Sequence, residues 1–144
     1  MVLDHVGIVN EDEGRAIRFY GDLLGLEKMK ESSVAPELAQ KLFSLGREIR
    51  MLVYGKESLK VEIFIIPGFT PPSPSVPHFC IQVPDLPGFL EKAKGEGVTV
   101  VAIERGGRTV YFAEDFSGNR IELKQQPHAG SRSLLKALGS LTQL

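Results

Sequence analysis

Several kinds of residue and segment are scarce in this chain, and each scarcity excludes a class of protein. The one cysteine, Cys80, cannot form an internal disulfide, so the composition does not favour a secreted, disulfide-bonded fold. A net charge of −1 gives no reason to expect nucleic acid or an anionic membrane surface as a partner. No apolar run approaches the length of a membrane span, and no basic-then-apolar leader is visible. We therefore expect a cytoplasmic protein that binds neither nucleic acid nor membrane.

The 144 residues suit one domain, and its sequence contains an internal repeat. His5-x-x-Ile8 near the start returns as His78-x-x-Ile81 after 73 residues (78 − 5). The residue pattern of each half then predicts a strand, a helix and three further strands. Each half also ends in a basic residue, a β-branched residue, Glu and an aliphatic residue, in Lys60-Val61-Glu62-Ile63 and Arg120-Ile121-Glu122-Leu123.

The repeat predicts the organisation of the chain. We expect one domain over 1–125, with repeat one over 1–67 and repeat two over 76–125. The Pro-rich segment 68–75 is too stiff to join a sheet interior and is expected to link the two repeats. Residues 126–144 form an extension with a final helix capped by Ser131, whose apolar side holds Leu134, Leu138 and Leu141. Residues 34–46 look helical and are either a lid over a pocket or a long connection.

Local patterns predict the details of these elements. The first strand covers Val2 to Val9, and Asn10 caps a helix whose core face holds Ile17, Tyr20 and Leu24. In repeat two, Asp85 caps the helix. The segment Arg105-Gly106-Gly107-Arg108 is a hairpin turn. His128, in the Pro-Gly tail, is a surface residue.

Strand parity places one histidine and one glutamate of each half on the face away from the helices. Glu62 lies opposite Val61 and Ile63, and Glu122 lies opposite its own aliphatic neighbours in the same way. His78 lies opposite Phe79. An ionised carboxylate in a buried strand is costly unless a cation or a donor meets it. Taken singly, Glu62 is equally well an edge-strand surface residue and His78 a loop-end histidine.

Taken together, the four residues predict a metal site. Two such sheets can bend toward each other and bring His5, Glu62, His78 and Glu122 around one point. Imidazole nitrogen and carboxylate oxygen suit one divalent ion of Zn, Ni, Co, Mn or Fe.

The chain resembles the vicinal oxygen chelate superfamily, also called the glyoxalase/bleomycin resistance/dioxygenase superfamily. The resemblance covers residues 2–125 and depends on three motifs, Leu3-Asp4-His5-Val6-Gly7-Ile8, Arg18-Phe19-Tyr20-Gly21-Asp22-Leu23-Leu24-Gly25 and Asp115-Phe116-Ser117-Gly118-Asn119-Arg120-Ile121-Glu122-Leu123. It implies an α+β, glyoxalase-like fold of two tandem βαβββ units, whose curved mixed sheets form a cleft with helices outside. The ligand positions of the superfamily then fall on His5, Glu62, His78 and Glu122, and its members commonly form homodimers.

The ligand pattern is closest to that of glyoxalase I, which has Glu at the second position, where methylmalonyl-CoA epimerases typically have Gln. It implies a metal-dependent lyase or isomerase that moves a proton next to a carbonyl of a small 2-oxo or 2-hydroxy substrate, through a metal-bound enediolate. Glyoxalase I holds glutathione with an Arg and an Asn where this chain has Val9 and Ile66. This departure argues against a glutathione adduct as substrate. An Fe(II) extradiol-type dioxygenase and a metal-free binding or resistance protein are the alternatives.

The residues of the site face have expected roles. Glu122 is our preferred base, and Glu62 is a ligand or a second base. The carboxylate would act as a base when two incoming substrate oxygens displace or lengthen its bond to the metal. Four residues of the same face are possible substrate contacts: Phe64, Cys80, Gln82 and Lys124. The alternative for each is a solvent-exposed sheet residue or one that only fills space.

Overall fold

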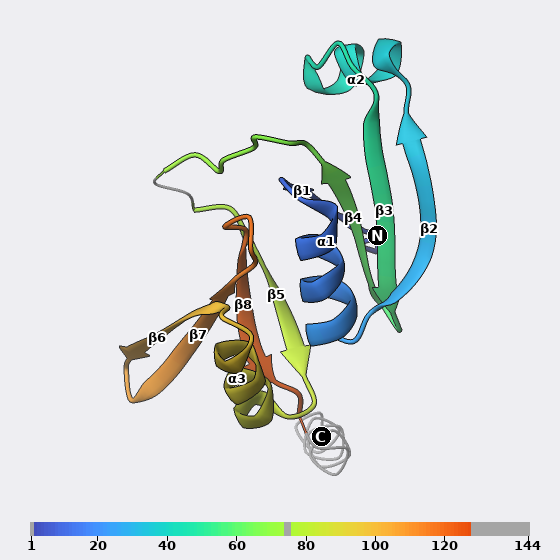
Figure 1. The fold of residues 1–144 in the computed structure, drawn as a ribbon. Coiled ribbons are helices and arrows are strands. Elements are labelled where there is room, and N and C mark those ends of the chain that lie inside the picture. Colours follow the sequence, from blue (N-terminus) through green and yellow to red (C-terminus); the bar gives the residue numbers. More distant parts are fainter. Residues whose placement is uncertain (1, 74–75, 128–144) are drawn as a thin grey trace, which may run out of the picture.

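The computed structural model describes residues 2–73 and 76–127, which form two four-stranded sheets and their helices (Figure 1). The first half of the chain contains, in order, β1 (Val6–Asn10), α1 (Glu13–Ala16), the π-helix η1 (Ile17–Leu23), β2 (Glu27–Val34), α2 (Pro36–Phe43), β3 (Ile49–Lys56) and β4 (Leu59–Ile65). The second half contains β5 (His78–Val83), α3 (Leu86–Gly95), β6 (Thr99–Arg105), β7 (Arg108–Glu114) and β8 (Arg120–Gln125).

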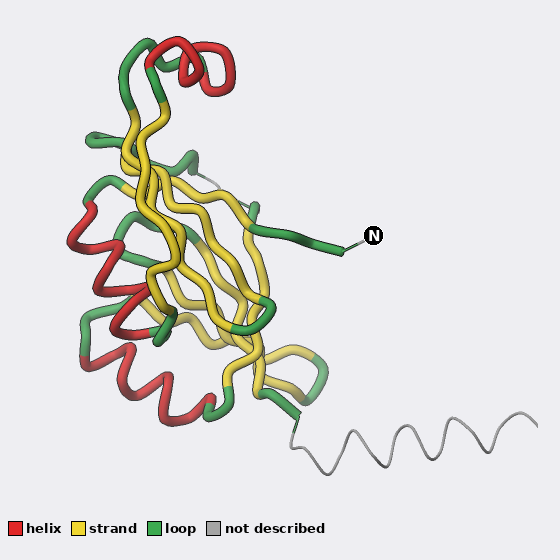
Figure 2. The backbone as a smooth tube through the Cα atoms, turned by 90° about the vertical axis from the view of Figure 1, so that its right-hand side faces the viewer, coloured by secondary structure: helices red, strands yellow, loops and turns green. Residues whose placement is uncertain are grey.

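Both sheets have one strand order. It is β1-β4-β3-β2 in the first sheet and β5-β8-β7-β6 in the second, and in each the first strand pairs in parallel with the last while the other pairs are antiparallel. Figure 2 shows α1 and α3 on the same side of the strands. The predicted α+β fold of two βαβββ units is therefore confirmed, with α2 as an insertion in the first unit only. Among the described residues, no helix is long and apolar enough to cross a membrane.

Alternation along β4 and β8 separates a buried face from the site face. Val61, Ile63 and Ile121 have no exposed surface, because they pack under the helices in a core that both halves share. Glu62 and Glu122 lie between such residues and point to the opposite face. The helix-facing side of each final strand therefore fixes the position of its glutamate.

The first helix differs from its predicted form. Asp12, and not Asn10, caps α1, since its side chain accepts a hydrogen bond from the Arg15 amide. The helix then widens into η1, where the Leu24 amide donates to Phe19 O, five residues back. The buried side chains are consequently Phe19, Tyr20 and Leu23 together with Ala16, whereas Ile17 and Leu24 are only partly buried.

A buried polar cluster joins the two halves. Asp115, 4% exposed, accepts hydrogen bonds from the side chains of Asn10, Tyr20 and Asn119 and from the amides of Ser117 and Asn119. Burial, and then the neighbouring Asp115 carboxylate, raise the pKa of the Tyr20 phenol well above its ordinary value. Asn10, which the sequence placed at a helix cap, therefore ties the end of β1 to the β7–β8 turn.

The structure also tests the predicted boundaries and caps of several elements. The first strand begins at Val6, so His5 lies just before it and not within it. The helix expected within 34–46 is confirmed as α2, with Pro36 in its first turn. Asp85 caps α3 as predicted. The final helix after Ser131 and His128 lie outside the described residues.

Candidate functional site

The first half-site consists of His5 and Glu62. Glu62 projects from the middle of β4, and its Oε2 lies 3.5 Å from Nε2 of His5. The other ring nitrogen, Nδ1, lies 2.9 Å from the Asp4 carboxylate. Hydrogen bonds from Lys60 and then from His5 lower the pKa of Asp4, so this carboxylate is ionised and accepts a hydrogen bond from Nδ1.

The second half-site repeats this arrangement with His78 and Glu122. Nε2 of His78 lies 3.7 Å from Oε2 of Glu122, and the ring packs edge-on against Phe112. Nδ1 lies 2.9 Å from the carbonyl oxygen of Val76. A carbonyl can only accept a hydrogen bond, so Nδ1 carries a proton, and in the neutral form of the ring Nε2 presents its lone pair to Glu122.

In both half-sites, then, Nε2 of an imidazole faces a carboxylate oxygen, and in the neutral form of the ring both atoms are acceptors. Two acceptors at this spacing repel one another unless a proton or a cation lies between them. Two ligands that are each about 2.0–2.2 Å from one metal ion stand roughly 3–3.6 Å apart, which is close to both measured separations. An acceptor on the second ring nitrogen is also the usual support of a metal-binding histidine. The donor set therefore fits a divalent ion.

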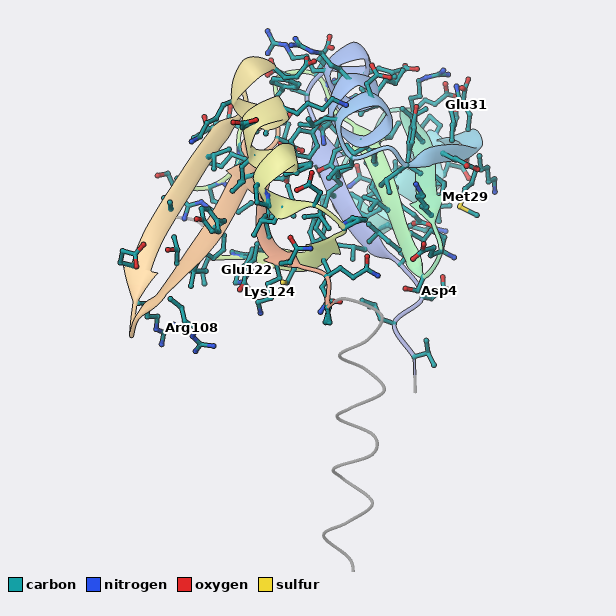
Figure 3. All side chains as sticks on the ribbon, turned by 90° about the horizontal axis from the view of Figure 1, so that it is seen from below. Asp4, Met29, Glu31, Arg108, Glu122 and Lys124 are labelled. Atoms are coloured by element: carbon teal, nitrogen blue, oxygen red, sulfur yellow. The ribbon has the colours of Figure 1, made fainter. Side chains whose placement is uncertain are left out.

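The two half-sites lie apart within one chain. The side chain of Asn119 donates to the carbonyl oxygen of Val9, so the end of β1 adjoins the start of β8, where His78 pairs with Arg120. His5 is four residues before Val9, about 13 Å along an extended chain. Figure 3 shows Glu122 on the second sheet and Asp4, the neighbour of His5, beside the first. Within residues 2–73 and 76–127, no group of three or more His, Cys, Asp or Glu could hold one metal ion.

The surroundings of the two glutamates differ. Glu62 is 25% exposed and Glu122 is 18% exposed. Lys124 Nζ lies 3.2 Å from Oε1 of Glu122, and hydrogen bonding to that carboxylate raises the lysine pKa. Figure 3 shows both side chains on β8. In the first half the residue two positions after the glutamate is instead Phe64, whose ring packs against Phe43 of α2 at a centroid distance of 5.2 Å.

The remaining predicted residues of the site face lie on β5. Cys80 is the cross-strand partner of Glu122, and Gln82 is the partner of Lys124. Burial and the adjacent Glu122 raise the pKa of the Cys80 thiol, which makes it a poor nucleophile at neutral pH. Gln82 is exposed.

A large cleft opens beside the second half-site. Its volume is about 860 Å³, and His78, Phe112, Glu122 and Lys124 line it together with residues of the β6–β7 hairpin. A second hollow of about 480 Å³ adjoins it at His78 and Phe112. Sequence reasoning missed Phe112 and the hairpin, because their contribution depends on how β7 separates from β8.

Comparison with known proteins places the chain in a family. A family model of the glyoxalase/bleomycin resistance protein/dioxygenase superfamily matches residues 4–113. None of the curated proteins compared with the chain is significantly similar to it in sequence.

Solved structures share the fold. The glyoxalase I of Leishmania major, described as trypanothione-dependent, is 19% identical with a TM-score of 0.68, and the match covers 99% of this chain and 96% of that chain. A glyoxalase family protein from Enterococcus faecalis is 21% identical with a TM-score of 0.66, covering 84% and 94%. The fosfomycin resistance protein FosX of Listeria monocytogenes, in a complex with Mn(II) and dihydroxypropylphosphonic acid, is 20% identical with a TM-score of 0.62, covering 90% and 96%.

Proposed function

Because the chain belongs to the glyoxalase/bleomycin resistance protein/dioxygenase superfamily, we propose that it is a divalent-metal-dependent lyase or isomerase. Its reaction is the transfer of a proton at a carbon next to a carbonyl, in a small 2-oxo or 2-hydroxy compound. The observation that carries the proposal is the position of His78 Nε2, and likewise of His5 Nε2, 3.7 Å and 3.5 Å from a glutamate oxygen. The Mn(II) in the FosX structure supports a metal on this fold.

His5, Glu62, His78 and Glu122 would hold one ion. When bound, the ion supplies Lewis acidity, which stabilises negative charge that develops beside a carbonyl. Glu122 removes the proton and returns it, acting as general base and then as general acid. Lys124 holds Oε1 of this carboxylate, so Oε2, which faces His78, would both coordinate the ion and accept the proton once incoming substrate oxygens displace it from the ion. Glu62 is the second carboxylate and completes the ligand set.

The separation of the two half-sites supports a homodimer as the active form. Each chain presents one His–Glu pair per sheet, so a twofold-symmetric pair of chains can join the first half-site of one chain to the second half-site of the other. Such a dimer contains two equivalent sites with four ligands each. The side chain of Val101 is 40% exposed beside the second half-site, and contact with a second copy would cover it.

A mixing experiment tests the metal site and the dimer together. One variant carries His5→Ala with Glu62→Ala, and the other carries His78→Ala with Glu122→Ala. Each variant alone should lose tightly bound metal. After the two are unfolded and refolded together, random pairing should restore about a quarter of the wild-type metal content, since half the dimers are mixed and each has one intact site.

The outcomes separate the alternatives. Metal content by mass spectrometry that stays at wild-type level in both variants contradicts the ligand assignment. No recovery on mixing, with metal present in the wild type, contradicts the shared site. Oxygen uptake with no solvent deuterium entering a 2-oxo substrate would favour a dioxygenase over the proposed proton transfer.

A further inference from the structure

The cleft beside the second half-site is formed by two strands that separate. β7 and β8 are paired from Glu114↔Arg120 to Tyr111↔Leu123, and beyond that point β7 continues to Arg108 without a partner in β8. The cleft therefore has the β6–β7 hairpin on one side and the end of β8, with Lys124, on the other. Figure 1 shows the hairpin diverging from β8, and Figure 3 shows Arg108 at its tip.

Two arginines at the hairpin tip carry charge that the described part of the chain does not neutralise. Arg105 and Arg108 are direct cross-strand partners at the ends of β6 and β7, joined by Gly106 and Gly107, both at positive φ. Like charges directly opposite one another destabilise a strand pair. Neither arginine forms an ion pair within residues 2–73 and 76–127, whereas Arg50 of the first half pairs with Glu13 and Glu31.

The wall between these arginines and the half-site is apolar. Ile103 and Val110 are cross-strand partners and line the cleft, and Phe112 follows at the cross-strand position of Glu122. Arg108 is four residues from Phe112, about 13 Å along the strand. A ligand that reaches from Glu122 to the hairpin tip therefore crosses an apolar surface and ends between cations.

We propose that the substrate carries an anionic group, a phosphate or a carboxylate, on an apolar spacer, and that Arg105 and Arg108 bind this group while the reacting carbon lies at Glu122. Lys124, across the cleft and paired with Glu122, adds to the positive field. Guanidinium groups suit this task because they bind phosphate and carboxylate through two parallel hydrogen bonds. The inference rests on the proposed function, since it names the substrate class of the same site.

The test measures binding to the full-length protein by NMR and needs no turnover. Hexyl phosphate and hexanoate are the probes, with hexanol and inorganic phosphate as comparisons. We expect both amphiphilic anions to shift the amide signals of Ile103, Val110 and Lys124 until the shifts saturate. Each anion should bind more tightly than either comparison compound. The double variant Arg105→Gln with Arg108→Gln should weaken this binding by about tenfold.

A charge-matched control is available on the helix side of the sheets. Arg15 and Lys94 are exposed on α1 and α3, and changing both to Gln removes the same charge without touching the cleft. Equal weakening in this control, or binding of hexanol as tight as that of hexyl phosphate, overturns the proposal. Inorganic phosphate binding as tightly as hexyl phosphate overturns the role of the apolar wall. If the wild-type protein binds the probes but no metal, only the proposed function is contradicted.

Discussion

The two halves share one strand order but differ in how far their last hairpin closes. In the first half, β3 and β4 stay paired from Lys56↔Leu59 to Arg50↔Ile65, along almost the whole hairpin. In the second, β7 and β8 pair only near their turn. Most of β3 is buried, while Ala113 is the buried residue of β7. The comparison indicates that the first half keeps its strands for packing, whereas the second opens them to form a cleft.

The largest expected difference between the halves is catalytic. Glu122→Gln should reduce proton transfer by about two to four orders of magnitude, because the amide cannot take a proton but can still coordinate a metal. Glu62→Gln should reduce it less. Solvent deuterium exchange into a 2-oxo thioester or a hemithioacetal, followed by NMR, measures both. Exchange that survives in Glu122→Gln but is lost in Glu62→Gln would transfer the role of the base to Glu62.

Removing the polar link between the halves should cost the most stability. Asp115→Ala leaves buried donors of Asn10 and Tyr20 without an acceptor, and we expect a loss of about 3–5 kcal/mol in the free energy of unfolding. Asp85→Ala, which removes only the cap of α3, should cost about 1 kcal/mol. Urea denaturation compares the two variants. Similar losses would show that Asp115 is no more than a local turn residue.

Tyr20 gives the same link a pH dependence. Its phenol pKa is raised on folding, so the unfolded chain releases this proton first, and stability falls as the pH rises above about 10 toward the folded pKa. Tyr20→Phe should cost about 1–2 kcal/mol at neutral pH and should flatten this alkaline decline. Thermal unfolding at several pH values, from neutral to about 11, measures the alkaline decline in stability. Tyr54→Phe, which keeps Tyr20, is the control and should retain more of the decline.

The smallest expected effect compares one exposed arginine from a strand of each half. Arg50→Gln removes exposed ion pairs to Glu13 and Glu31 and should destabilise the protein by up to about 1 kcal/mol. Arg108→Gln removes a repulsion from Arg105 and should be neutral or stabilising by a few tenths of a kcal/mol. Denaturation midpoints of the two variants, measured at low salt, test the difference. A clear loss of stability in Arg108→Gln would mean that the hairpin tip is structural.

The sequence allows much of this fold to be predicted, because alternation and a repeated motif are local signals. Val61 and Ile63 identify the buried face of β4, and the repeat then predicts the same for β8. The prediction that Asn10 caps the first helix is wrong, because its partner, Asp115, is distant in sequence and a local capping pattern cannot reveal it. The cleft could not be predicted either, since no pattern in Arg105-Gly106-Gly107-Arg108 tells how far the hairpin leans away from β8.

The candidate site divides in the same way. The pairing of His5 with Glu62 and of His78 with Glu122 follows from strand order and parity, both of which the repeat predicts. The relation between the two pairs depends on how the sheets pack and on how chains assemble. Neither is encoded in a local pattern, so the joining of all four residues stays a prediction.

The π-helix η1 has a consequence for how this chain tolerates changes in length. A π-turn contains one residue more than an α-turn, so a single deletion within Ile17–Leu23 could leave a regular helix in place. Such a deletion removes the extra residue and keeps Phe19, Tyr20 and Leu23 on the buried side, so the Tyr20 hydroxyl can still reach Asp115. The same deletion in the regular helix α3 would rotate its two ends by about 100° relative to one another. The chain should therefore tolerate a one-residue shortening in its first helix better than in α3.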